Sequence, residues 1–263
     1  MLQDKQEYLN HIKDENEIIN MRKILDIIER VIFNHSTEVS DFLNPYQRRL
    51  AYSILNRFID IKYHEEGGYE EAERKVIVVY PDYLQQDYID FSISAIKVWG
   101  NFKFSDISHK DYLGSVLGLG IKRDKIGDII VHDEYAYIIV HKDLLTFINM
   151  NLENIGRESV KTKEVKISDI EKPQEEYKII KTTVSSMRLD NIISSSYNMS
   201  RNNSSKIIKS GNVKVNWEPI DNISFDVEIG DLISIRKYGR VKIKDVLGES
   251  KKGRLKIMLK KYI

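Results

Sequence analysis

The stretch "SRNNSSKIIKSGNVKVNW", residues 200–217, is a short polar, basic segment that passes directly into an alternating one. Ser200 is a favoured N-cap residue, and Gly211 suits the left-handed conformation that ends many helices. Residues 213–217 alternate apolar and polar side chains, which is the period of a half-buried strand. The stretch therefore predicts a short helix, a tight corner at Gly211 and a strand.

Cations gather on this helix and strand, and we expect the glycine corner to bring them onto one surface. Such a surface would match the phosphates of a folded RNA, while serine and asparagine would supply hydrogen bonds to phosphate or 2′-hydroxyl groups. The predicted RNA-binding residues are Arg188, Arg201, Asn202, Ser204, Lys206, Lys209, Lys214 and Asn216.

The charge of the chain is unevenly distributed along its 263 residues. Residues 184–263 contain 16 Lys and Arg against 8 Asp and Glu, a net charge of +8. The chain as a whole has a net charge of +1, so residues 1–183 carry −7. This asymmetry indicates a polyanion-binding module attached to an acidic body. The alternative is a lysine-rich surface that is merely solvated.

Residues 187–235 hold three motifs in a fixed order: "RLD", then the opening stretch, then "VEIGDLISI". This order resembles the alpha-L RNA-binding domain, also called the S4 domain. Two positions depart from the usual pattern: Ser204 or Ser205 stands where a small residue such as alanine is usual, and Trp217 where glycine is frequent. The resemblance implies that residues 184–263 form an S4-type RNA-binding domain.

The rest of the chain predicts an α+β protein with two further parts and a linker. Residues 1–72 show apolar stripes of helical period and predict a helical N-terminal domain. Residues 73–168 read as β-β-α-β-β-α-β, beginning with a β-branched strand at 75–80, and predict a central RRM-like α+β sandwich. Residues 169–183 are polar and predict a linker or loose strand.

The motifs "DFLNPYQRRL" (41–50), "GGYEEAERKVIVVYPDY" (67–83) and "HKDYLGSVLGLGIKRDKIGDIIV" (109–131) resemble the YlmH family of bacterial RNA-binding proteins. The genes of this family lie near cell-division genes. The resemblance implies a role in ribosome-associated quality control, with rRNA and tRNA bound on the large ribosomal subunit that carries peptidyl-tRNA. It further implies support of C-terminal alanine tailing, with the alanine-tailing factor as a partner.

Two other segments add candidate RNA contacts. The basic loop after Gly120 and the alternating basic tail from residue 236 both present cations. For the tail, lysines that protect a sheet edge from aggregation are an equal alternative. The central segment has no aromatic RNP-like sequence, so stacking of bases on its sheet is not expected. The secondary RNA-binding candidates are Lys122, Arg123, Lys125, Arg236, Lys237 and Arg240.

Catalysis is the less favoured function class. "RLD" (188–190) is similar to the catalytic motif of pseudouridine synthases, but here it opens the small RNA-binding module, so Asp190 is expected to be a helix-start charge. Glycines 114, 118 and 120 lack the spacing of a phosphate-binding loop, and the six histidines lack metal-ligand spacing. We therefore expect no catalytic residue, metal or cofactor. An RNA-modifying enzyme or its remnant, and an RNA-tethered cell-division adaptor, remain as alternatives.

The composition of the chain indicates the cellular compartment of the protein. The chain contains no cysteine, which suits a reducing compartment. No apolar run approaches the length of a membrane span, and the first residues do not begin a secretory signal. We therefore expect a cytoplasmic protein that does not bind membranes; we also expect a monomer.

Overall fold

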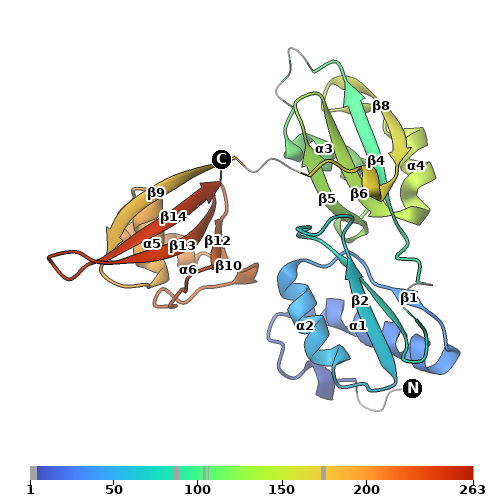
Figure 1. The fold of residues 1–263 in the computed structure, drawn as a ribbon, viewed down its shortest axis with the longest axis horizontal. Coiled ribbons are helices and arrows are strands. Elements are labelled where there is room, and N and C mark those ends of the chain that lie inside the picture. The colour runs from blue at the N-terminus through green and yellow to red at the C-terminus, as the bar shows by residue number, and fades with distance from the viewer. Residues whose placement is uncertain (1–4, 86–88, 103–104, 106, 173–175, 263) are drawn as a thin grey trace. The chain divides into compact units, whose positions relative to one another are not determined.

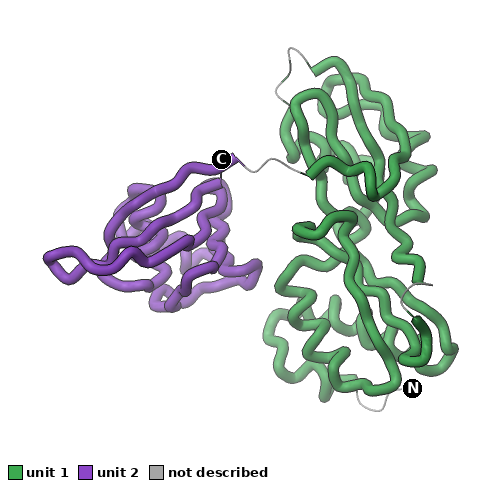
Figure 2. The backbone as a smooth tube through the Cα atoms, in the orientation of Figure 1, with its two compact units in different colours: residues 1–173 green, residues 174–263 purple. Residues whose placement is uncertain are grey.

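The chain forms two compact units, residues 1–173 and residues 174–263 (Figure 2). Each unit has its own sheets and core, and each is described by itself. Helices are mixed with antiparallel strand pairs, so the protein belongs to the α+β class (Figure 1). The computed structural model describes residues 5–85, 89–102, 105, 107–172 and 176–262.

The first unit begins with two helices on a three-stranded antiparallel sheet of order β1-β3-β2. Asn44 caps the second helix by accepting a hydrogen bond from the Gln47 backbone N–H (3.0 Å), and the Gln47 side chain accepts one from Asn44. Pro45 takes the first helical position, as its fixed φ favours. The elements are α1 (Glu15–Asn34), β1 (Glu38–Val39), α2 (Pro45–Leu55), β2 (Ile61–Glu66) and β3 (Val76–Pro81).

Two expectations for this part are wrong. Residues 1–72 are not purely helical, because β1 and β2 lie among them. The strand expected to open the central sheet, β3, instead pairs with β1 and β2. The reason is burial on both faces of β3: Ile77 and Val79 face the core under α1 and α2, whereas Val76 and Val78 face the central part of the unit. A strand that is buried on both faces has a continuous apolar sequence. Such a sequence does not indicate which sheet the strand joins.

The central part of the first unit has the β-α-β-β-α-β chain order and the antiparallel sheet order β5-β6-β4-β8 of an RNA-recognition fold. A short strand, β7, extends the sheet beyond β8. The expected RRM-like domain is therefore present. Its elements are β4 (Ile93–Gly100), α3 (His109–Gly118), β5 (Ile126–Val131), β6 (Tyr135–His141), α4 (Leu145–Asn151), β7 (Asn154–Ile155) and β8 (Glu158–Val165).

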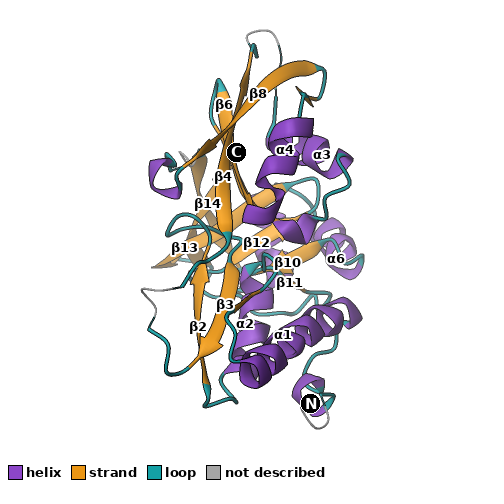
Figure 3. Cartoon of the chain, turned by 90° about the vertical axis from the view of Figure 1, so that its right-hand side faces the viewer, coloured by secondary structure: helices purple, strands orange, loops and turns teal. Residues whose placement is uncertain are grey.

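Helices α3 and α4 lie on the same side of this sheet (Figure 3). The sheet side chains that face them, including Ile96, Val98 and Ile138, are completely buried. On the opposite face, Ile139 and Tyr137 pack against Phe42 and the outer side of β3. At the end of that face toward the β5–β6 turn, Lys97, Trp99 and Tyr135 line an open pocket.

The second unit is a six-stranded antiparallel sheet of order β11-β10-β12-β13-β14-β9, with α5 and α6 packed on one face. Leu189 and Ile192 of α5, together with Ile208 of α6, are completely buried against that face. The elements are β9 (Tyr177–Val184), α5 (Leu189–Ser196), α6 (Arg201–Lys209), β10 (Val213–Val215), β11 (Glu218–Pro219), β12 (Leu232–Ile235), β13 (Gly239–Glu249) and β14 (Leu255–Tyr262).

The second half of the expected linker over residues 169–183 belongs to a strand, β9, which begins at Tyr177. β9 pairs with β14 along its whole length, from Val184 opposite Leu255 to Tyr177 opposite Tyr262. Its sequence looks polar because only its inward residues, such as Ile180, contact the core. The C-terminal unit therefore begins before the first residue that its sequence motif predicts.

Candidate nucleic-acid interface

Helix α6 presents a polar, basic surface because only a narrow stripe of it enters the core. Ser200 caps the helix by accepting a hydrogen bond from the Asn203 backbone N–H (3.2 Å). Ser204 and Ile208, one turn apart, are completely buried beneath the helix. The side chains left exposed on the other sides include Arg201, Asn202, Lys206 and Lys209.

Asp190, in the first turn of α5, joins the two helices through two arginines. Its carboxylate accepts hydrogen bonds from Arg188 Nε (3.2 Å) and from Arg201 Nε (3.2 Å) and Nη2 (2.7 Å). The Asp190 side chain is only 3% exposed, whereas those of Arg188 and Arg201 are 38% and 57% exposed. A buried carboxylate therefore fixes one edge of each guanidinium and leaves the rest of both groups facing solvent.

Burial would raise the pKa of the Asp190 carboxyl, but the hydrogen bonds and charges of Arg201 and Arg188 hold that pKa below its ordinary value. Asp190 is therefore ionised at neutral pH and serves to position two cations. Both carboxylate oxygens accept hydrogen bonds from these arginines, Oδ1 from Arg188 and Oδ2 from Arg201. The sequence expectation of a helix-start charge accounts for its place in α5 but misses this role.

The prediction that Ser204 contacts RNA is contradicted by the structure. Its side chain is completely buried, and its hydroxyl lies within hydrogen-bond distance of two backbone carbonyl oxygens, those of Asp190 (3.0 Å) and Arg201 (2.9 Å). The completely buried residue lies where α6 packs on α5. This packing also explains why a small residue is usual at the position.

Asn216 also has a structural role in place of the predicted RNA contact. Its side-chain amide donates to Asp231 Oδ1 (2.7 Å) and accepts from the Leu232 backbone N–H (2.9 Å). Asn216 and Trp217 have φ values of 48° and 67° and form the two-residue turn between β10 and β11. Such turns favour glycine at the second position, which explains the frequent glycine where Trp217 stands.

Lys214 does not share a surface with α6, contrary to the sequence expectation. Its neighbours Val213 and Val215 point into the core beneath the helices, so Lys214 points to the opposite face of the sheet. There it lies in a cross-strand row with Ser234 of β12 and Arg240 of β13. Gly211, at φ 70°, makes the predicted corner but does not unite the two sets of cations.

The loop over residues 122–125 is a predicted secondary RNA contact. Two of its three cations bond to other groups of the first unit. Arg123 donates to the backbone carbonyls of Ile126 and Gly127, and Lys125 Nζ lies 2.8 Å from Asp41 Oδ1. Of the three predicted cations, Lys122 alone is exposed. The loop therefore joins the N-terminal and central parts of the unit.

The remaining secondary candidates lie around the β12–β13 turn. Arg236 and Lys237 are exposed, and Lys237 has a φ of 72° in the turn itself. Arg240 is half-buried and its guanidinium carbon lies 5.5 Å from the centre of the Tyr262 ring. Arg240 shares the cross-strand row of Lys214, whereas the turn that contains Arg236 and Lys237 reaches α6, because Tyr238 lines a pocket with Lys206.

The open end of the central sheet carries aromatic side chains that the sequence expectation missed. A cavity of about 650 Å³ is lined by Lys97, Trp99, Tyr135 and Lys163 among others. Lys97 Nζ lies 3.6 Å from the centre of the Tyr135 ring, and Trp99 faces Tyr135 across the β4–β6 pair. The sequence signal for this surface is period-two alternation in β4, which places Lys97 and Trp99 on the face away from α3 and α4.

Two absences hold for the part of the chain that the structure describes, one of grouped metal ligands and one of membrane-spanning helices. Among those residues, no three His, Cys, Asp or Glu side chains are placed to hold a metal ion. Within the same residues, no helix has the length and hydropathy needed to cross a membrane.

Three family models match successive parts of the chain. Residues 16–84 match the model described as "YlmH, N-terminal", and residues 87–169 match "Putative RNA-binding domain in YlmH". Residues 187–233 match the S4 domain model. The resemblances to the YlmH family and to the S4 domain are confirmed by these matches, and the second model begins after β3.

Two relatives are similar over long stretches. "Ribosome-associated protein quality control protein P2" of Bacillus subtilis (strain 168) is 32% identical over 250 residues, which are 95% of this chain and 96% of the relative. The solved structure of "Cell division protein ylmH from Streptococcus pneumoniae" is 28% identical with a TM-score of 0.51, and covers 60% of this chain and 95% of that one.

Proposed function

Because this chain belongs to the YlmH family, we propose that it is a non-catalytic RNA-binding factor of ribosome-associated quality control, which binds rRNA and tRNA on the large ribosomal subunit. The observation that carries the proposal is the exposed basic surface of α6, together with the two arginines that the buried Asp190 positions. Charge-assisted hydrogen bonds from fixed guanidinium groups suit phosphate oxygens. Such a role places the protein with the ribosomes of the cytoplasm.

The name of the Bacillus subtilis relative supports the quality-control setting, and the S4 match supports RNA as the ligand. Within that setting, the proposed target is a large subunit that still carries peptidyl-tRNA, and the proposed outcome is support of C-terminal alanine tailing. The alanine-tailing factor would then act on the same particle. The engagement of Asp190 by two arginines argues against the alternative of an RNA-modifying enzyme.

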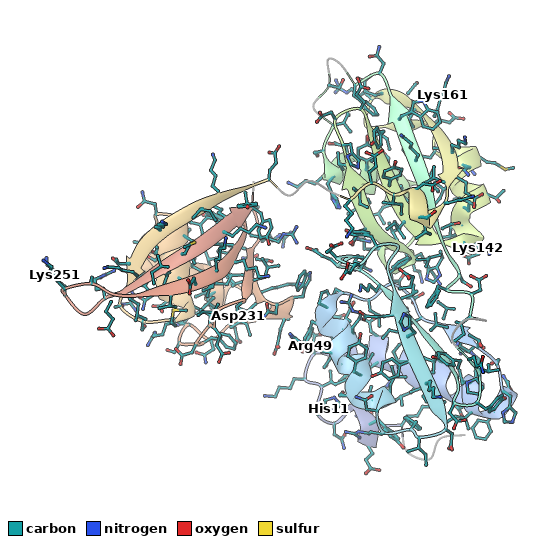
Figure 4. All side chains as sticks on the ribbon, viewed as in Figure 1. His11, Arg49, Lys142, Lys161, Asp231 and Lys251 are labelled. Carbon is teal, nitrogen blue, oxygen red and sulfur yellow. The ribbon has the colours of Figure 1, made fainter. Side chains whose placement is uncertain are left out.

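The test measures binding of the full chain to purified large subunits carrying peptidyl-tRNA, over a range of salt concentrations. The double variant Lys206→Glu, Lys209→Glu reverses two exposed cations of α6, and we expect weaker binding with a shallower dependence on salt, by about one contact per lysine. The matched control is Lys251→Glu, Lys252→Glu in the β13–β14 turn, where Lys251 lies at the far tip (Figure 4). Equal affinity of the α6 variant and the wild type would contradict the proposal.

A second candidate function is an adaptor in cell division, favoured by the name of the similar Streptococcus pneumoniae protein. Residues 1–183, with a net charge of −7, would supply the surface for a division protein. Nuclease treatment separates the two functions: partners captured by the full chain through RNA are lost, whereas a direct division partner stays bound.

A further inference from the structure

The outer face of the six-stranded sheet, opposite α5 and α6, is strongly basic. The register aligns its residues in rows: Lys214, Ser234 and Arg240 in one, then Lys242, Lys260 and Ile179, then Asp245, Met258 and Lys181, then Gly248, Lys256 and Thr183. Six of these side chains are cations and one, Asp245, is an anion. We call this set of rows the outer sheet face.

Protection of a sheet edge does not account for these cations. Lysines on an edge strand prevent pairing with another chain, but β13 lies between β12 and β14, and β14 lies between β13 and β9. Arg240, Lys242, Lys256 and Lys260 therefore belong to interior strands. The edge explanation, which the sequence left open for the basic tail, fails for these four residues.

Simple solvation does not account for the arrangement either. Lys242 lies directly opposite Lys260, and like charges in that position destabilise a sheet, whereas solvated surfaces usually mix both signs. Lys242 and Lys181 form no ion pair among the described residues. A face that keeps repelling charges side by side on interior strands fits a polyanion that neutralises them on binding.

Two tyrosines lie among these cations. Lys260 Nζ lies 4.1 Å from the ring centre of Tyr177 and 5.0 Å from that of Tyr262, which face each other across the β14–β9 pair. Tyr177 is 46% exposed, and its neighbour Ile179 is 42% exposed. Cations beside exposed rings are the combination with which proteins hold both the phosphates and the base or ribose faces of RNA.

We infer that the outer sheet face binds a second RNA segment, so that the C-terminal unit holds one RNA on α6 and another on the opposite side of its sheet. The inference rests on the proposed RNA-binding function and adds a bridging activity to it. Five of the six cations, all except Lys214, lie outside the residues 187–233 that match the S4 model. The second surface is therefore built mainly by β9, β13 and β14.

The first test separates binding from folding with one substitution. Lys242→Glu turns the like-charge pair with Lys260 into an opposite-charge pair, so we expect an unchanged or raised Tm. The same change removes a cation from the outer sheet face, so we expect weaker binding of a fluorescent RNA hairpin and a salt dependence shallower by about 1. Unchanged affinity in Lys242→Glu would overturn the inference.

The second test asks whether two RNAs bind at once. Donor-labelled and acceptor-labelled copies of the hairpin are mixed with the full chain, and mass photometry counts hairpins per chain. We expect energy transfer and two hairpins for the wild type, and one hairpin without transfer for Lys242→Glu, Lys260→Glu. The α6 variant, Lys206→Glu, Lys209→Glu, should likewise keep one hairpin, and the control Lys251→Glu, Lys252→Glu should keep two.

The outcomes separate this inference from the proposed function. If the α6 variant loses all RNA and the outer-face variant keeps what the wild type binds, the outer sheet face does not bind RNA and the inference is overturned. If the outer-face variant loses all RNA and the α6 variant loses none, the proposed α6 interface is wrong and the outer sheet face stands. Displacement of the hairpin by polyglutamate, or by phosphatidylserine vesicles, as readily as by unlabelled RNA would also overturn the inference.

Discussion

Replacing Asp190 with asparagine tests whether a buried carboxylate organises the RNA-binding surface. Asparagine keeps the size of the side chain but loses its charge and offers an N–H₂ group to arginine donors. The wild-type carboxylate accepts three hydrogen bonds, from Arg188 Nε and from Arg201 Nε and Nη2. We therefore expect the variant to fold with lower stability and with both guanidinium groups less fixed.

The size of the loss follows from the exposure of the three groups. Hydrogen bonds to a charged group contribute about 1.5–3 kcal/mol when buried, but the two arginines are partly solvated, which screens the interaction. We expect a loss of about 1–2 kcal/mol for the C-terminal unit at neutral pH. For a unit of this size, that corresponds to a Tm lower by roughly 5–10 °C, measured by scanning calorimetry.

The effect should depend on pH in a defined direction. Since the folded state lowers the pKa of Asp190, its ionised form stabilises the fold above the ordinary value of 3.8, and this stabilisation is lost as pH falls through the lower folded pKa. Asparagine does not titrate, so the Tm difference between the two proteins should narrow at acid pH. Asp221→Asn removes an exposed carboxylate of the same unit and should leave Tm nearly unchanged.

Two results would refute the reasoning. One is a Tm difference that stays constant down to the lowest pH at which the unit is folded, because a titrating carboxylate would then not be its cause. The other is an Asp190→Asn variant as stable as Asp221→Asn at neutral pH, because the arginine contacts would then contribute nothing measurable.

Three further predictions concern other parts of the chain. Ser204→Ala should leave RNA affinity unchanged in fluorescence anisotropy, because the hydroxyl is completely buried; a clear loss would restore its predicted contact with RNA. With Trp217 replaced by phenylalanine, Trp99 is the only tryptophan, and single-stranded RNA should quench its fluorescence if bases stack on the central sheet. Gly127→Ala should destabilise the first unit by about 1–3 kcal/mol without altering the second, because the added Cβ would lie 2.7 Å from a ring carbon of Phe42; calorimetry of both transitions checks this.

Local features of the fold could be predicted from the sequence because they depend on neighbouring residues. The Asn44–Pro45 helix start, the α6 cap at Ser200 and the corner at Gly211 all lie where the sequence places them. From β4 onward, the order of strands and helices in the central part also follows from the period of its apolar residues. These features need only the chemistry of a few consecutive side chains.

Features that depend on distant partners could not be predicted in the same way. The apolar run of β3 fits any buried strand, and only its packing between two cores decides its sheet. β9 looks like a linker because its partner β14 is remote in sequence. For the candidate site, residue type located the cations of α6. The packing of α6 on the face of β10 that carries Val213 and Val215 separates Lys214 from them, and burial between the two helices excludes Ser204 from the surface.

The pairing of β9 with β14 also sets the order in which the C-terminal unit can be completed during synthesis. Val184 pairs with Leu255, which is 71 residues later in the chain, and Tyr177 pairs with Tyr262, which is 85 residues later. Contacts so distant in sequence form late, because a long loop must close before they contribute. A growing chain that has already made α5 and α6 therefore still lacks β10 to β14, and β9 pairs only after β14 has left the ribosome.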